Sequence, residues 1–437
     1  MKKLTLIELN EINLDIADSY IEKLNLEGFK KLKLLNSLKT NSEKKYELLE
    51  PWIQWHSIHT GLSAQEHGLF RLGDTTKNKN KNIFERLDSK GLKIGVISAM
   101  NVLNNFKHAA FFIPDPWTST HSGETFWEKK ISKFLNQAVN DNSKNEIRLV
   151  NYLYILLTFL RFARFKKYLQ FFKLAFFSFK KPWRKALFLD LLLSEVFFNL
   201  LIKHNLNFGT LFLNGGAHIQ HHYFFNCSLG VEKNKKQINP EWYVSHKYDP
   251  FAEMLIVYDE IIKEAVNLEN RNLIVATGLT QELDDKAVFY YRPKNHEDFL
   301  NKIGINFKRV LPRMSRDFLI EFSSEGEASN AEKLLSSIKL NDKYFFLKPD
   351  NRGTSIFMSI GYDREIYESD KIQLGEKSIE IFKELSFVAI KNGKHSEKGY
   401  LFLDKDIQAN DSYLENGTIN VKDIFFIIND FFKKSDF

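Results

Sequence analysis

Short apolar runs alternate with helical spacing through much of the chain. A buried strand is predicted at Leu4–Leu9, and helical periodicity follows over residues 15–26. A second strand is expected at residues 32–38, and two further apolar runs cover residues 208–214 and 272–277. Alternation of this kind is typical of a doubly wound sheet with helices on both faces, so the pattern predicts an α/β protein.

The pattern of apolar and polar positions changes after about residue 124. Residues 126–139 have helical spacing, residues 149–160 carry no charge, and residues 161–181 interleave Arg and Lys with Phe. The uncharged run is shorter than the ~20 apolar residues that span a bilayer. Two interpretations stay open: a helical cap whose Phe face packs on the core, or a helix that contacts a membrane surface. We expect these basic side chains to be mostly exposed: Arg161, Arg164, Lys166, Lys167, Lys173, Lys180 and Lys181.

A second interruption follows Arg292 and Pro293, and it has the mixed pattern of a small α+β segment. The core pattern returns near Gly399 and ends in a predicted helix over residues 421–432. The predicted organisation is core at 1–125, a Phe- and Lys-rich helical insertion at 126–205, core at 206–290, an α+β insertion at 291–389 and core at 390–437.

Composition narrows the class of protein. The 437 residues are 43% hydrophobic and 27% charged, which is typical of a globular chain. The net charge of +7 is spread along the sequence without a nucleic-acid-binding motif, so we expect no nucleic-acid partner. A single cysteine, Cys227, and the lack of a signal-peptide pattern at Met1 indicate a cytoplasmic protein.

The segment from Glu50 to Gly68 resembles the signature of the alkaline phosphatase superfamily, in its type I phosphodiesterase and sulfatase-like branches. Trp55, Thr60 and His67 fall in register with that signature. The resemblance implies a three-layer α/β/α core with metal ions at the carboxyl ends of the strands. The slot of the catalytic Thr or Ser is occupied by Pro51, which carries no nucleophile.

Other positions of the family's metal-binding motifs correspond to residues elsewhere in the chain. Asn10 and Glu11 stand where the family has Asp-Gly, and the later Ser-Asp-His-Gly motif is replaced by residues 277–280. The resemblance implies that His221 and His395 keep two ligand slots of one metal site. We therefore expect four segments, at Asn10, Trp55–Gly68, Ala217–His221 and His395, to converge at one end of a sheet, with one bound Zn or Mn and not a full two-metal site.

The candidate residues form three groups. The metal ligands are expected to be Glu11, His221 and His395. The catalytic candidates are Glu50, Gln54 and His218. The candidates for substrate binding are Trp52, Trp55, His222 and Gln281.

Two functions remain open from the sequence. The first is a hydrolase or transferase with a rebuilt site, acting on a phosphoester- or sulfoester-type group of a small molecule, a surface glycan or a lipid-linked intermediate. The second is an inactive pseudoenzyme that keeps the fold for ligand binding or assembly. The basic, Phe-rich insertion adds an anionic membrane surface as an expected partner, at the inner face of the membrane.

Overall fold

The computed structural model describes residues 1–72, 81–140, 148–231, 237–313 and 316–433. The described residues divide into two compact units. The first comprises Met1–Leu283 and Gly393–Phe437, and the second comprises Asp284–Asn392.

The first unit is built on a nine-stranded mixed sheet. In spatial order its strands are β18 (Leu414–Glu415), β19 (Thr418–Asn420), β2 (Asn36–Asn41), β17 (Lys398–Leu403), β6 (Asn272–Ala276), β1 (Leu4–Leu9), β5 (Phe208–Leu213), β3 (Ile94–Ile97) and β4 (Phe111–Ile113). The five strands from β6 to β4 are parallel, whereas β17 runs antiparallel to both of its neighbours, β2 and β6.

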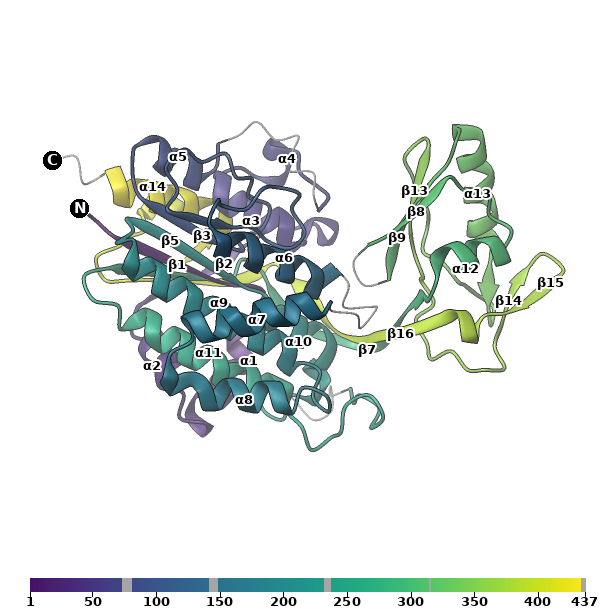
Figure 1. Ribbon diagram of the computed structural model, residues 1–437, viewed down its shortest axis with the longest axis horizontal. Helices are drawn as coiled ribbons and strands as arrows, with labels where there is room; N and C mark the ends of the chain where they lie inside the picture. The colour runs from purple at the N-terminus through teal and green to yellow at the C-terminus, as the bar shows by residue number, and fades with distance from the viewer. Residues whose placement is uncertain (73–80, 141–147, 232–236, 314–315, 434–437) are drawn as a thin grey trace. The chain divides into compact units, whose positions relative to one another are not determined.

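Helices cover both faces of this sheet (Figure 1). One face carries α3 (Pro51–Thr60), α5 (Ile83–Ser89) and α14 (Ile424–Lys433). The other carries α1 (Leu14–Lys23), α2 (Glu27–Leu32), α6 (Phe126–Asn140), α7 (Leu149–Phe162), α8 (Tyr168–Phe176), α9 (Arg184–Lys203), α10 (Gly215–Tyr223) and α11 (Pro250–Val266). A short helix, α4 (Ala64–His67), follows α3.

Alternation along the strands explains the three layers. Ile7 and Leu9 of β1 belong to one apolar core, whereas Leu4 and Leu6 belong to the core on the opposite face. Because successive side chains of a strand point to opposite faces, a strand buried on both sides reads as a continuous apolar run. The predicted α/β class, with a core of three layers, is confirmed.

The second strand lies later than predicted. Residues 32–38 were expected to form it, but Leu32 ends α2 and β2 begins at Asn36. Helix α2 packs closely on α11: a Cβ on Gly28 would lie 2.2 Å from the carbonyl oxygen of Asp259. The apolar residues at 29 and 32 therefore serve a helix face, which a short apolar run alone cannot distinguish from a strand.

The second unit is a small α+β structure around its own apolar core. It holds two four-stranded antiparallel sheets and two helices. The sheets are β12 (Asp350–Asn351), β13 (Ser355–Ser359), β9 (Asp317–Glu321) and β8 (Arg309–Pro312), and β11 (Lys343–Tyr344), β10 (Lys339–Leu340), β14 (Lys371–Leu374) and β15 (Lys377–Glu380). The helices are α12 (His296–Lys302) and α13 (Glu325–Ser337), and the paired strands β7 (Thr280–Pro293) and β16 (Leu385–Ser396) run from one unit into the other.

Candidate metal centre

The carboxyl ends of three neighbouring strands define the centre. Leu9 of β1 lies in register with Leu213 of β5, and Ala276 of β6 pairs with Glu8. The residues that follow these strands, Asn10 and Asn214 among them, are therefore brought to the same edge of the sheet. Ligands of open α/β sheets bind at this edge.

Three side chains meet there with their donor atoms close together. The Oε2 atom of Glu11 lies 3.1 Å from Nε2 of His221 and 3.3 Å from Nε2 of His395. The two Nε2 atoms are 3.4 Å apart. From the sequence we expected His221 and His395 to lie within reach of each other and of His218 or Glu11, and this is confirmed with Glu11 as the third residue.

The start of α10 fixes the position of His221. The backbone N–H of Gly215 donates to Asp190 at 2.7 Å, and that of Gly216 donates to the hydroxyl of Tyr258 at 2.8 Å. A Cβ on Gly216 would lie 2.1 Å from Cδ1 of Ile12, so only glycine allows this helix to approach the loop after β1. The two glycines after β5 thereby set the distance between His221 and Glu11.

Glu11 is buried and held from several sides. Its φ of 63° is left-handed, a region that costs a non-glycine residue ~1–2 kcal/mol. Its Oε1 accepts from the amide of Asn10 at 2.9 Å, and its Oε2 accepts from the amide of Gln281 at 2.5 Å. Burial alone would raise the pKa of this carboxyl, but the nearby His221 and His395 hold the pKa well below its usual value.

Asn10 and Trp55 form a support beneath the carboxylate. The indole N–H of Trp55 donates to Oδ1 of Asn10 at 2.7 Å, and the Asn10 amide donates to Oδ1 of Asn214 at 2.8 Å. Trp55 is fully buried and packs edge-on against Phe212. Its ring is therefore not open to a substrate, and the expectation that Trp55 contacts one is replaced by a role in orienting Asn10.

Glu50 lies beside the third ligand candidate. It is the residue before α3, and its Oε2 atom is 3.8 Å from Nδ1 of His395. Its side chain is one-third exposed. Among the catalytic candidates from the sequence, Glu50 is the one that the structure places against the Glu11, His221 and His395 cluster.

Two other candidates donate hydrogen bonds to backbone oxygens. The amide of Gln54 is buried and donates to the carbonyl of Leu48 at 2.7 Å, where it secures the chain before α3. The indole N–H of Trp52 donates to the carbonyl of Phe70 at 3.3 Å. Both contacts are to backbone oxygens of the segments that flank α3, and the roles of Gln54 in catalysis and of Trp52 in substrate binding stay predictions.

The remaining histidines lie on α10 with His221. The ring of His218 packs against those of His222 and Tyr223, and burial together with the nearby His221 lowers the pKa of His218 to about 4. The ring centroids of His221 and His222 are 6.1 Å apart. His218 and His222 thus lie beside the cluster and outside the triangle of donor atoms.

One supporting residue, Gln220, was missed from the sequence, and Gln281, a candidate for substrate binding, also has a supporting role. Gln220 donates to the carbonyl of Glu11 at 2.8 Å and accepts from the backbone N–H of Asn13 at 2.9 Å. Gln281 also donates to the carbonyl of Ala217 at 3.1 Å, which ties α10 to β7. A buried glutamine carries no distinctive sequence signal, although the position of Gln220 beside His221 marks it as a neighbour of the site.

Comparisons with known proteins find resemblance in structure and none in sequence. No protein-family model and no curated protein matches the chain. Phosphonoacetate hydrolase from Sinorhizobium meliloti 1021, in complex with phosphonoacetate, is similar at 11% identity and a TM-score of 0.43, over 98% of this chain and 95% of that one. Human ectonucleotide pyrophosphatase/phosphodiesterase 5 is similar at 11% identity and a TM-score of 0.42, over 99% and 95% of the two chains.

A mutant of alkaline phosphatase PafA is also similar, at 10% identity and a TM-score of 0.42, over 96% of this chain and 93% of that one. Identities and TM-scores this low say nothing about the activity of this chain.

Proposed function

We propose that this chain is a hydrolase for a phosphoester- or sulfoester-type bond and that it works with one divalent metal held by Glu11, His221 and His395. The observation that carries the proposal is the triangle of their donor atoms, with edges of 3.1, 3.3 and 3.4 Å. Tetrahedral Zn with ligands at about 2.0–2.1 Å has edges of about 3.3–3.4 Å, so the triangle fits one such ion.

The chemistry of the donor set also suits a divalent ion. Two imidazoles and one carboxylate are a common set for Zn, and three protein ligands leave a position for water or substrate. When bound, such an ion supplies Lewis acidity toward a phosphoryl-type oxygen and lowers the pKa of a bound water. Zn and Mn are the ions that we expect from this donor set.

The chain's own residues supply orientation and proton handling. The amides of Asn10 and Gln281 hold the carboxylate of Glu11 toward the two histidines. Glu50 faces Nδ1 of His395, where a carboxylate orients an imidazole ligand. Because Glu50 is also partly exposed, we assign it an acid–base role. It would donate a proton to the leaving group or accept one from the attacking water.

The proposal extends to the class of substrate. A small molecule with a phosphoester or sulfoester group fits a single-ion site, and a surface-glycan or lipid-linked intermediate is the form that we favour. The ring of His222 is the candidate contact for the substrate beyond the triangle. The single cysteine, Cys227, is buried and supports a location in a reducing compartment.

Elemental analysis and a substrate screen test this proposal together. The purified chain is expected to bind one Zn or Mn and to hydrolyse at least one member of a panel of phosphodiesters, phosphomonoesters and sulfate esters. H221A and H395A should lose both metal and activity. H246A is the matched control, because His246 is a half-exposed histidine that pairs with Glu241 outside the cluster.

The alternative, a pseudoenzyme, is favoured by Pro51 in the nucleophile slot. It predicts metal binding without turnover of any ester in the panel. Turnover that persists in H221A and H395A, or a wild-type chain that binds no divalent metal, would contradict the proposed site.

A further inference from the structure

Helix α7 presents an apolar face that the rest of its unit does not cover. Leu149, Leu153, Leu156 and Leu160 are 88, 50, 51 and 57% exposed. Their spacing of four, three and four residues places them on one side of the helix. The opposite side, with Thr158, Phe159 and Phe162, is buried, so these leucines are not needed for the core.

Helix α8 repeats this arrangement. Leu169, Phe172 and Phe176 are 66, 61 and 78% exposed, whereas Phe171 and Leu174 of the same helix are buried. Phe165 and Phe179, which flank the helix, are also exposed. We call the exposed apolar residues of α7 and α8, with Phe165 and Phe179, the apolar face. Large groups of exposed apolar side chains mark surfaces that meet a protein or a membrane.

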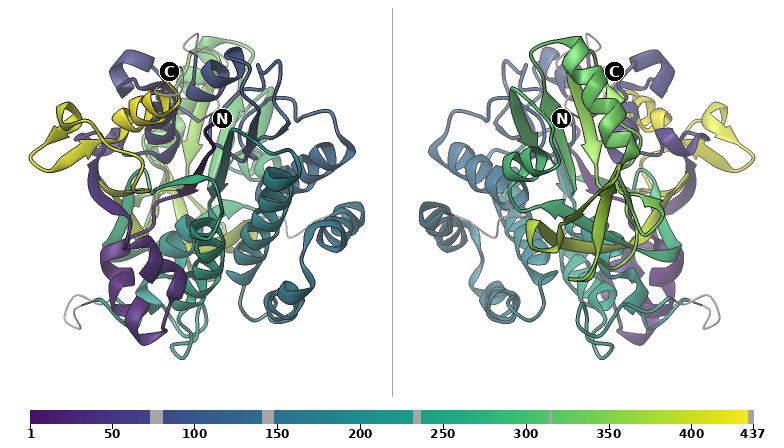
Figure 2. Two further views of the ribbon diagram at one scale, coloured as in Figure 1. Left: turned by 90° about the vertical axis from the view of Figure 1, so that its left-hand side faces the viewer. Right: turned by 90° about the vertical axis from the view of Figure 1, so that its right-hand side faces the viewer.

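The charged residues within the segment that carries the apolar face have one sign. Residues 148–189 contain ten Lys and Arg residues and no Asp or Glu. In the views of Figure 2, the blue and teal helices of this segment lie at the outer edge of their unit. Four of the basic residues are exposed beside the apolar face: Arg161, Lys166, Lys173 and Lys180.

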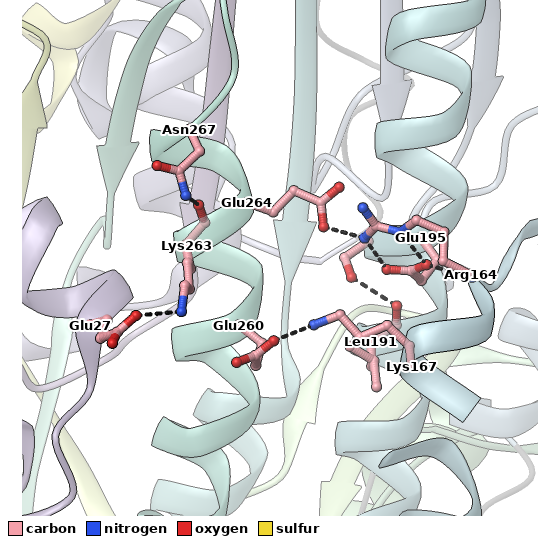
Figure 3. A network of polar contacts seen from close by, with 10 residues as sticks. Glu27, Arg164, Lys167, Leu191, Glu195, Glu260, Lys263, Glu264 and Asn267 are labelled. Atoms are coloured by element: carbon pink, nitrogen blue, oxygen red, sulfur yellow. Dashed lines mark hydrogen bonds and ion pairs between the residues drawn. The ribbon is translucent and has the colours of Figure 1, made fainter. Parts of the chain in front are cut away.

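Of the seven basic side chains that were expected to be mostly exposed, the other three hold the segment to the unit. Arg164 lies between Glu195 of α9 and Glu264 of α11, and Lys167 donates to Glu260 at 2.6 Å (Figure 3). Lys181 pairs with Glu253 at 2.6 Å. Acidic residues of α9 and α11 draw these three cations inward, so α7 and α8 are anchored with their apolar face outward.

We propose that the apolar face of α7 and α8 docks on the surface of an anionic lipid bilayer. A bilayer offers both an anionic headgroup layer for the exposed cations and an apolar interior for the Leu and Phe side chains. A second copy of this chain fits less well, since a symmetric contact would bring two basic segments together. Within the described residues, no helix is long and apolar enough to cross a bilayer, so docking would be from one side.

The segment also reaches the helix that carries His221. Trp183, the residue before α9, packs against Tyr223 at the end of α10, and the ring centroids are 5.3 Å apart. Docking would thus bring α10 close to the lipid surface. The proposal goes beyond the hydrolysis proposed above and does not depend on it.

Co-sedimentation of the full chain with vesicles tests the proposal. Wild type should sediment with phosphatidylcholine vesicles that contain phosphatidylglycerol and stay in solution with phosphatidylcholine alone. A variant that carries R161Q, K166Q, K173Q and K180Q should bind anionic vesicles at least about tenfold more weakly, because each cation near an anionic surface favours binding several-fold. A variant with L169S, F172S and F176S should lose binding as well.

Matched controls distinguish the loss of the apolar face and its cations from a general loss of charge or of exposed apolar residues. The first control carries K44Q, K90Q, K203Q and K405Q, which removes four exposed lysines elsewhere, and the second carries L34S and I202S. Both controls should bind like wild type, and all variants should keep the wild-type melting temperature. The proposal is overturned if wild type ignores anionic vesicles, if the face variants bind unchanged, or if light scattering shows a dimer that the F172S and F176S substitutions dissociate.

Discussion

The side chains of Ser57 and His67 share a hydrogen bond of 3.1 Å between Oγ and Nε2. The backbone N–H of Leu69 donates to Nδ1 of His67 at 3.0 Å, so the proton of the neutral ring is on Nε2. Burial lowers the pKa of His67 to about 4, and the ring is therefore neutral near pH 7. His67 thus cannot accept a proton from Ser57 as a general base would.

We predict from this contact that no covalent phospho- or sulfo-enzyme forms on α3. The other hydroxyl of the helix, Thr60, donates to the carbonyl of His56 at 2.7 Å and is likewise engaged. Mass spectrometry of the chain quenched during turnover should show an unmodified α3 peptide. The S57A variant should hydrolyse the ester at nearly the wild-type rate, and a trapped adduct on either residue would contradict this prediction.

Substitution of Glu50 by Gln is predicted to slow turnover more than it weakens metal binding. The E50Q variant keeps the shape of the side chain but removes the charge that faces His395, and loss of an acid–base group typically costs about 10²–10⁴-fold. Steady-state kinetics and metal content are measured on the same preparation. E47Q, which changes an exposed glutamate three residues earlier, is the control and should leave both quantities unchanged.

Substitution of Gln281 by Leu is predicted to weaken metal binding. The amide of Gln281 donates to Oε2 of Glu11, and removal of a group that orients a metal ligand typically costs about 10–100-fold in affinity. Competition with a chromophoric chelator measures the Kd for Zn. An unchanged Kd in a folded Q281L variant would show that Asn10 alone is enough to hold the carboxylate.

Asp190 is predicted to make the stability of the fold pH-dependent. This buried carboxyl accepts from the hydroxyl of Tyr258 at 2.6 Å and from Gly215, and burial raises its pKa to about 6. The native state therefore binds the proton more tightly than the unfolded state, in which the pKa of Asp is about 3.9. Asp190 should lower the free energy of unfolding as pH rises from about 4 to about 6.

The D190N variant removes this titration while its amide oxygen can still accept both hydrogen bonds. Relative to wild type, D190N should gain about 2–3 kcal/mol in the free energy of unfolding between about pH 4 and about pH 7. Urea unfolding followed by circular dichroism at several pH values measures the difference. A difference that does not change over this range would show that Asp190 keeps an ordinary pKa.

Much of the fold could be predicted because local pattern and tertiary burial agree. Leu4–Leu9 is apolar throughout because both faces of β1 are covered, and α3 begins at Pro51, which suits the first turn of a helix. The shift of β2 to Asn36 could not be foreseen, since it depends on how closely α2 approaches α11. Periodicity carries no information about which distant helix a segment meets.

Some residues of the candidate site could likewise be predicted from the sequence, and others could not. Glu11, His221 and His395 could be named because they follow strand ends or occupy retained slots of a resembling signature. The buried position of Trp55 could not be predicted, because an indole at this place in the sequence could either line a pocket or pack in the core. Contacts such as that between Gln220 and Glu11 join residues 209 positions apart, and only the folded chain brings them together.

The left-handed backbone of Glu11 links the stability of a loop to the side chain that the loop carries. A glycine at this position would adopt the φ of 63° without strain, but it would bring no carboxylate to His221 and His395. The stability that the loop after β1 loses through this backbone conformation is therefore tied to the carboxylate that completes the cluster.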